Sequence, residues 1–177
     1  MIDMSSVRSK AKEQKQKHTI SVLANHNLNA LCRIVGIFSG RGFDIDSISF
    51  GTGERPGVAR ITLTTQGDEH IVEQITKQLH KVIDVIKVKD LTYDPYIERE
   101  LAIIKVTTTP ASRSEIMQIT QVFRAKIIDL SQDNLSVEVT GNKDKIDAAI
   151  EMLRPFGIKE VARTGSVALK REFNGTI

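Results

Sequence analysis

A short polar segment near the N-terminus carries the residues of this sequence that are best suited to bind a small molecule. Four of them lie in one loop between a predicted strand and a predicted helix: Asn25, His26, Asn27 and Asn29. The first N–H groups of a helix and its positive dipole end attract small carboxylates. The same residue types are favoured in turns and as helix caps, so this loop alone leaves both interpretations open.

The elements around this loop follow from apolar spacing. A strand is predicted at residues 19–23, and the helix after the loop has apolar residues at helical spacing, namely Leu31, Ile34, Val35 and Phe38. Asn27 or Asn29 can cap this helix, and Gly42 can take the left-handed conformation that ends it. A second strand is predicted at residues 43–50.

No converging set of acids, bases, nucleophiles or metal ligands predicts an enzyme. The four histidines fall on separate predicted elements, and no pair has the H-x-x-x-H spacing of a metal site. Asp44 and Asp46 would lie on one face of the strand at 43–50, where a solvated face is favoured over a metal site. We therefore predict no catalytic residue, no metal site and no cofactor on this chain.

The glycine-rich stretch at residues 51–57 resembles a phosphate-binding loop in composition. It joins two predicted strands instead of opening a helix, and Pro56 occupies the last glycine position of the G-x-G-x-x-G pattern. A β-hairpin turn is the better interpretation.

The composition and length of the chain exclude several classes of function. The chain has 177 residues, 40% hydrophobic and 27% charged, which is ordinary for a globular protein. Cys32 is the single cysteine, which excludes an internal disulfide and a cysteine-cluster zinc site. No secretory segment or apolar run of roughly 20 residues is present, so a cytoplasmic protein without a membrane partner is expected. The aromatic run that stacks RNA bases is missing, so no nucleic-acid partner is expected.

The predicted elements occur in the order βαββαβ twice. This order, with a hairpin in the middle, is typical of the ferredoxin-like fold, an α+β architecture in which two helices cover one face of an antiparallel sheet. The other face must be polar or hidden, and the many Val and Ile residues favour hiding it by association. We predict a basic flexible tail at 1–17, a first domain at 18–92, a linker at 93–100, a second domain at 101–171 and a flexible end at 172–177.

Start and stop signals support this order. Asp68 can cap the second helix, Ser112 with Glu115 has the spacing of a capping box for the third, and Pro155 and Gly157 stop the fourth. Further strands are predicted at residues 58–65, 82–91, 101–106, 127–130, 135–140 and 158–162.

Five segments, in this order, resemble the regulatory small subunits of acetolactate synthase, also called acetohydroxyacid synthase. They cover about residues 18 to 171 and read HTISVLANHNLNALCRIVGIFSGRGFDIDSISFG, RITLTTQGDEHIVEQITKQLHKVIDVIKVKDL, ERELAIIKV, FRAKIIDLS and KIDAAIEMLRPFGIKEVARTGSVALKR. One such motif is a weak signal, but five in order are specific.

The resemblance implies an N-terminal ACT domain, a C-terminal ferredoxin-like domain and no catalytic activity. It implies a homodimer formed through ACT domains, with a branched-chain amino acid such as valine at the interface. It also implies a large catalytic subunit as partner, which this chain activates and which carries thiamine diphosphate, magnesium and FAD. The residues at the family's effector positions are Asn25, His26, Asn27, Asn29, Ala30, Leu31, Asp44 and Ile45.

Some of these positions depart from the family pattern. Asn29 stands where the family usually has glycine, and Asp44 stands where it usually has asparagine. Asn25 and His26 replace the usual acidic or asparagine residues of the loop. A weak response to valine is therefore expected. The alternative hypothesis is a free-standing ACT-type amino-acid sensor with no obligate enzyme partner.

Overall fold

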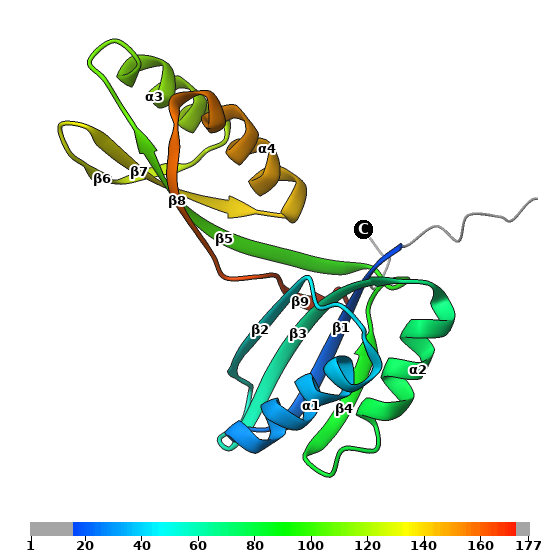
Figure 1. Ribbon diagram of the computed structural model, residues 1–177. Coiled ribbons are helices and arrows are strands. Elements are labelled where there is room, and N and C mark those ends of the chain that lie inside the picture. The colour runs from blue at the N-terminus through cyan, green and yellow to red at the C-terminus, as the bar shows by residue number, and fades with distance from the viewer. Residues whose placement is uncertain (1–15, 173–177) are drawn as a thin grey trace, which may run out of the picture.

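The first half of the chain folds into a four-stranded antiparallel sheet with both helices on one face (Figure 1). The computed structural model describes residues 16–172. The strand order is β2-β3-β1-β4, and this is called the first sheet below. Its elements are β1 (Gln16–Asn25), α1 (Leu28–Arg41), β2 (Ser47–Thr52), β3 (Val58–Gly67), α2 (Glu69–Leu79) and β4 (Val85–Asp90).

The second half repeats this plan. Its main sheet has the order β6-β7-β5-β8, which matches the first sheet strand for strand, and α3 and α4 cover one face (Figure 1). The predicted α+β fold with two ferredoxin-like units is confirmed. The elements are β5 (Tyr96–Thr107), α3 (Arg113–Val122), β6 (Lys126–Leu130), β7 (Asn134–Gly141), α4 (Lys143–Leu153), the short helix η1 (Arg154–Phe156) and β8 (Ile158–Arg163).

Each unit has its own core, because alternate strand residues and one stripe of each helix point into the same layer. The first core includes Ile20, Val22, Ile34, Phe38, Ile61, Leu63, Ile75 and Leu79. The second includes Ile104, Val106, Ile116, Leu135, Val137, Ile146 and Leu153.

The strand predicted at residues 43–50 begins only at Ser47, so Asp44 and Asp46 do not share a strand face. The Thr65 hydroxyl donates a hydrogen bond to the carbonyl oxygen of Asp44 at 2.5 Å. This side-chain bond fixes the connection between α1 and β2, before the regular pairing of β2 with β3 begins.

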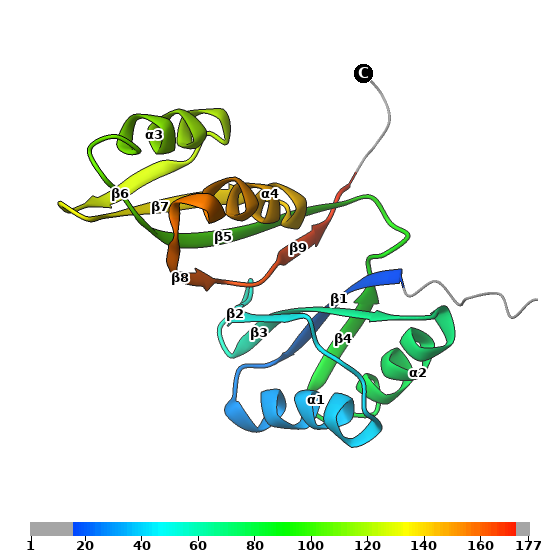
Figure 2. The same cartoon turned by 45° about the horizontal axis from the view of Figure 1, so that its top comes forward.

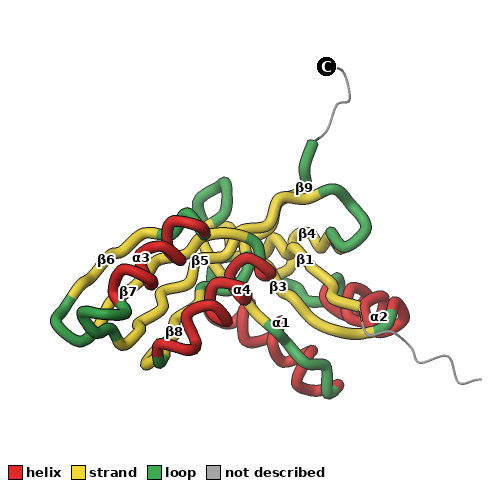
Figure 3. The backbone as a smooth tube through the Cα atoms, turned by 90° about the horizontal axis from the view of Figure 1, so that it is seen from above, coloured by secondary structure: helices red, strands yellow, loops and turns green. Residues whose placement is uncertain are grey.

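The predicted linker is shorter than expected, because residues 96–100 are the first part of β5. They pair antiparallel with a strand that the sequence did not predict, β9 (Val167–Lys170), with Ile97 opposite Leu169 and Arg99 opposite Val167. The paired segment of β5 and β9 is called the ribbon below. Figure 3 shows β5 continuing from the second sheet towards β9.

The ribbon lies on the outer face of the first sheet, which is the face opposite α1 and α2 (Figure 2). This face is rich in Ser and Thr. The backbone N–H of Ala168 donates to Thr62 Oγ1 at 3.3 Å, and that of Ser166 donates to Ser47 Oγ at 3.5 Å. The outer face is thus polar, and the chain's own C-terminal strand covers part of it.

Glu98 joins the ribbon to the first sheet. Its Oε1 accepts from Lys17 Nζ of β1 at 2.9 Å and from Ser166 Oγ at 2.6 Å. Burial by itself raises the pKa of Glu98, but the hydrogen bonds from Ser166 and Lys17 outweigh it and lower the pKa below its ordinary value. Because the folded-state pKa is lowered, the stabilisation is present above the unfolded pKa and is lost as the pH falls through the folded pKa.

We expect Glu98→Gln to lower the free energy of unfolding at pH 7 by roughly 1–3 kcal/mol, since a neutral amide replaces the half-buried carboxylate whose charge strengthens the bonds from Lys17 and Ser166. The difference from wild type should shrink as the pH falls below about 4. Urea unfolding at both pH values measures it, with Glu115→Gln on the exposed side of α3 as a control expected within about 0.5 kcal/mol of wild type. A difference that is the same at both pH values would contradict the assignment.

The helix caps agree with the sequence except at α3. Asp68 Oδ1 accepts from Ile71 N at 2.7 Å, as predicted. The predicted capping box is wrong, because Ser112 has helical backbone angles and its hydroxyl bonds Thr109 instead. Of the predicted tails, residues 1–15 and 173–177 lie outside the described residues, whereas residues 16 and 17 belong to β1.

Candidate functional site

The N-terminal end of α1 is built by Asn27. This residue has extended backbone angles, and its Oδ1 accepts a hydrogen bond from Ala30 N at 2.8 Å. Its carbonyl oxygen accepts from Leu31 N at 3.5 Å. Asn27 is therefore the cap, and Asn29 lies on the first turn with an exposed side chain.

We expect Asn27→Ala to lower the free energy of unfolding by about 1 kcal/mol, the usual cost of losing an N-cap. Asn29→Ala is the matched control, because it removes the same amide from the first turn without removing the cap, and should stay within about 0.5 kcal/mol of wild type. Chemical denaturation of the three proteins measures both. Equal losses for the two variants would contradict the assignment of the cap.

The loop before α1 is held from two sides. Asn25 N donates to the Asp84 carbonyl oxygen at 2.9 Å, and His26 N donates to the Gly57 carbonyl oxygen at 2.8 Å. The His26 ring lies 5.2 Å from that of Phe50, measured between ring centroids. These contacts fix the loop over the end of the sheet.

Asp84 and Arg33 complete this end of the molecule, and the sequence did not predict either. Asp84 accepts from Asn25 Nδ2 at 3.3 Å and from Arg33 Nη1 at 3.1 Å. No sequence signal could have found them, because Asn25 and Asp84 are 59 residues apart.

The first turn of α1 has backbone N–H groups that have no hydrogen-bond acceptor within the described chain. The first N–H groups of a helix have no partner within the helix. Asn27 satisfies those of Ala30 and Leu31, so the N–H groups of Leu28 and Asn29 are the donors left for a ligand within the described chain. A carboxylate fits such donors, because the helix dipole favours negative charge there.

Asp44 lies at the other end of the helix. It follows Gly42, whose φ of 68° ends α1 in the left-handed conformation as predicted. Because α1 has 14 residues, its ends are about 20 Å apart. The structure therefore brings the predicted residues Asn25 to Leu31 together, but it places Asp44 and Ile45 away from them within one chain.

Asp44 has an exposed side chain beside a small cavity, and Ile45 packs on the first core. The cavity measures about 190 Å³ and is lined by Gly42, Phe43, Asp44, Gln66, Gly67, Asp68 and Ile71. This end offers a carboxylate to a ligand, whereas the start of α1 offers N–H groups.

The outward side of α1 carries small or apolar residues. Leu28, Cys32 and Val35 are exposed. A Cβ atom at Gly36 or Gly40 would meet no atom within 4 Å, so the helix backbone is open to close approach there. In the same unit β2 is an edge strand, which within the described chain pairs with β3 alone.

Residues 16–172 contain neither a cluster of potential metal ligands nor a membrane-spanning helix. No three His, Cys, Asp or Glu side chains in this range gather into a group that could hold a metal ion. No helix in it is long and apolar enough to cross a membrane.

The fold and this site define an ACT-type regulatory protein, with an open helix end in the first of two ferredoxin-like units. Residues 20–87 match the family model of the AHAS small subunit-like ACT domain, and residues 99–172 match that of the small subunit of acetolactate synthase.

Relatives that align with most of this chain belong to the same family. The chain is 46% identical to the acetolactate synthase small subunit of Aquifex aeolicus over 92% of this chain and 85% of the relative. It is 52% identical to a probable acetolactate synthase small subunit of Methanothermobacter thermautotrophicus over 87% of this chain and 92% of the relative. The crystal structure of the Thermotoga maritima small subunit superimposes with a TM-score of 0.80 at 37% identity, covering 88% of this chain and 98% of that one. The chain belongs to the family of acetolactate synthase small subunits.

Proposed function

We propose that this chain is the non-catalytic regulatory subunit that binds and activates the catalytic subunit of acetolactate synthase in branched-chain amino acid biosynthesis. The catalytic subunit would carry thiamine diphosphate, magnesium and FAD and form acetolactate from pyruvate. The observation that carries this proposal is that both halves of one chain match the two small-subunit domain models in order.

We propose further that two copies pair side by side through α1 and β2. The edge position of β2 and the open side of α1 at Gly36 and Gly40 support this pairing. A two-fold axis makes the same patch of each copy contact the other. It would run the two α1 helices antiparallel, so the start of one helix would lie beside Asp44 of the second copy.

The pairing would complete an effector site for valine or a related amino acid. The effector carboxylate would accept from the N–H groups of Leu28 and Asn29 of one copy. Its ammonium group would lie beside Asp44 of the second copy, at the position where the family usually has a neutral asparagine. The separation of the two ends of α1 in a single chain supports a site shared between two copies.

Reconstitution tests the function. The chain is added in increasing amounts to the purified catalytic subunit from the same organism, and acetolactate formation from pyruvate is measured. We expect the rate to rise to a plateau, and the chain alone to form no acetolactate. An unchanged rate at saturating small subunit, together with amino-acid binding by the chain alone, would instead identify a free-standing sensor.

A further inference from the structure

A cavity of about 600 Å³ lies between the ribbon and the outer face of the first sheet. Its floor comes from β2 and β3, including Ser49, Arg60 and Thr62, and its wall comes from the ribbon, including Ile97 and Val167. This cavity is called the ribbon groove. It lies on the side of the sheet opposite α1, so it is separate from the proposed effector site (Figure 2).

The wall of the ribbon groove presents apolar side chains to solvent. Ile97 is 46% exposed, Val167 52% and Leu169 55%. Ile97 and Leu169 are directly opposite in the ribbon, so their side chains share one face. A contiguous exposed apolar patch of this kind marks an interaction surface.

The groove and the smaller cavity beside it are strongly basic. Glu54, Arg60 and Leu169 line both cavities, which therefore adjoin. Their lining contains five cationic side chains and one carboxylate: Arg60, Lys87, Lys89, Arg99 and Lys170, with Glu54. Glu54 pairs with Arg60 at 3.0 Å, and Asp94 pairs with Lys170 at 2.7 Å. Lys87, Lys89 and Arg99 are therefore the cations of this lining that have no carboxylate partner among the described residues.

We propose that the ribbon groove, together with the smaller cavity beside it, is the docking surface for an acidic segment of the catalytic subunit that also carries apolar side chains. The charge of the lining selects an acidic partner, and Ile97, Val167 and Leu169 receive its apolar residues. The inference rests on the proposed function. The chain's own first fifteen residues do not suit the groove, because they are basic at Arg8, Lys10, Lys12 and Lys15. Single-stranded RNA does not suit it either, because no aromatic side chain lines the groove to stack on bases.

The test compares two charge-reversal variants of the full chain. Lys87→Glu with Lys89→Glu reverses two lysines of the smaller cavity in this docking surface and is called the groove variant, and Lys126→Glu with Lys159→Glu reverses two exposed lysines of the second unit as the matched control. The dissociation constant for the purified catalytic subunit is measured at low and high salt. We expect the groove variant to bind at least about tenfold more weakly and with less salt dependence, since interfacial charge steers association. The control should bind like wild type.

A third variant, Leu169→Gln, tests the apolar part and should weaken binding at both salt concentrations. Equal Kd values for wild type and the groove variant would overturn the inference while leaving the function intact. Equal weakening by the control would also overturn it, because the effect would then follow net charge. Binding of a labelled single-stranded RNA that only the groove variant loses, with unchanged affinity for the catalytic subunit, would assign the groove to nucleic acid. A wild-type chain that forms no complex would refute the proposed function and this inference together.

Discussion

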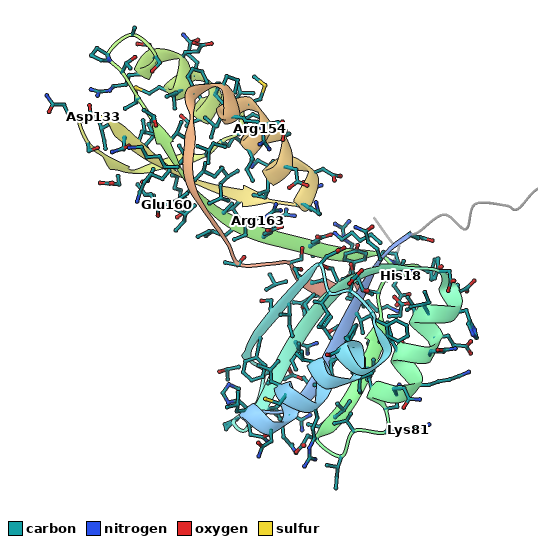
Figure 4. The ribbon with its side chains drawn as sticks, in the orientation of Figure 1. His18, Lys81, Asp133, Arg154, Glu160 and Arg163 are labelled. Carbon is teal, nitrogen blue, oxygen red and sulfur yellow. The ribbon has the colours of Figure 1, made fainter. Side chains whose placement is uncertain are left out.

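Replacing Arg163 with alanine is expected to lower the free energy of unfolding by about 3–5 kcal/mol, because it leaves a buried carboxylate without its partner. Figure 4 labels Arg163, which lies at the end of β8. Its Nε donates to Glu100 Oε1 at 2.5 Å and its Nη2 donates to Glu100 Oε2 at 3.1 Å. Glu100 is only 5% exposed. Arg163 Nη1 also donates to Asp147 of α4 at 2.8 Å, so one guanidinium ties helix and sheet together.

Arg154→Ala is the matched control. Arg154 pairs with Glu151 through a 2.7 Å contact, but the two side chains are 65% and 66% exposed, so the loss should stay within about 1 kcal/mol. A double variant, Arg163→Met with Glu100→Leu, should recover most of the stability, since an apolar pair leaves no buried charge. Urea unfolding measures all four proteins. Similar losses for Arg163→Ala and Arg154→Ala would show that Glu100 is solvated in the folded protein.

Valine is expected to inhibit the reconstituted enzyme weakly, and Asn29→Gly with Asp44→Asn is expected to strengthen the response roughly 10- to 100-fold. Asn29 lies in the first turn of α1, whose N–H groups would donate to the effector carboxylate. Asp44 adds a negative charge beside the effector, and we expect its repulsion of the effector carboxylate to outweigh its attraction of the ammonium group. Changing one such charge-assisted bond alters the binding free energy by roughly 1–3 kcal/mol, and about 1.4 kcal/mol is tenfold in affinity.

The measurement is a valine titration of acetolactate formation with wild type, each single variant and the double variant. Asp129→Asn, an exposed acid of β6, is the control for a general change of charge and should leave the titration unchanged. Strong inhibition of the wild-type enzyme at micromolar valine would refute the expectation and make Asn29 and Asp44 a working variant of the site.

Elements with local signals could be predicted from the amino-acid sequence alone. The apolar stripe with Asn27 before it and Gly42 after it defines α1, because a side-chain acceptor at the start and a left-handed glycine at the end satisfy the helix termini. The alternation of apolar and polar residues predicts β3 in the same way. The succession of such local helix and strand signals predicts the doubled βαββαβ order. The predicted capping box at Ser112 failed because a competing local bond to Thr109 was equally available to the hydroxyl.

Contacts between residues far apart in the sequence depend on how the elements pack. The polar stretch before residue 101 becomes a strand because β9, some seventy residues later, supplies its partner, and no local pattern encodes that pairing. Asp84 joins Asn25 in the same non-local way. Asp44 is separated from Asn29 by the length of α1, and this distance follows from helix geometry. Whether the two residues can still contribute to one binding site depends on what packs beside the helix. Side-chain type and spacing act within a few residues along the chain, whereas a binding site is assembled from contacts that form only when distant elements pack.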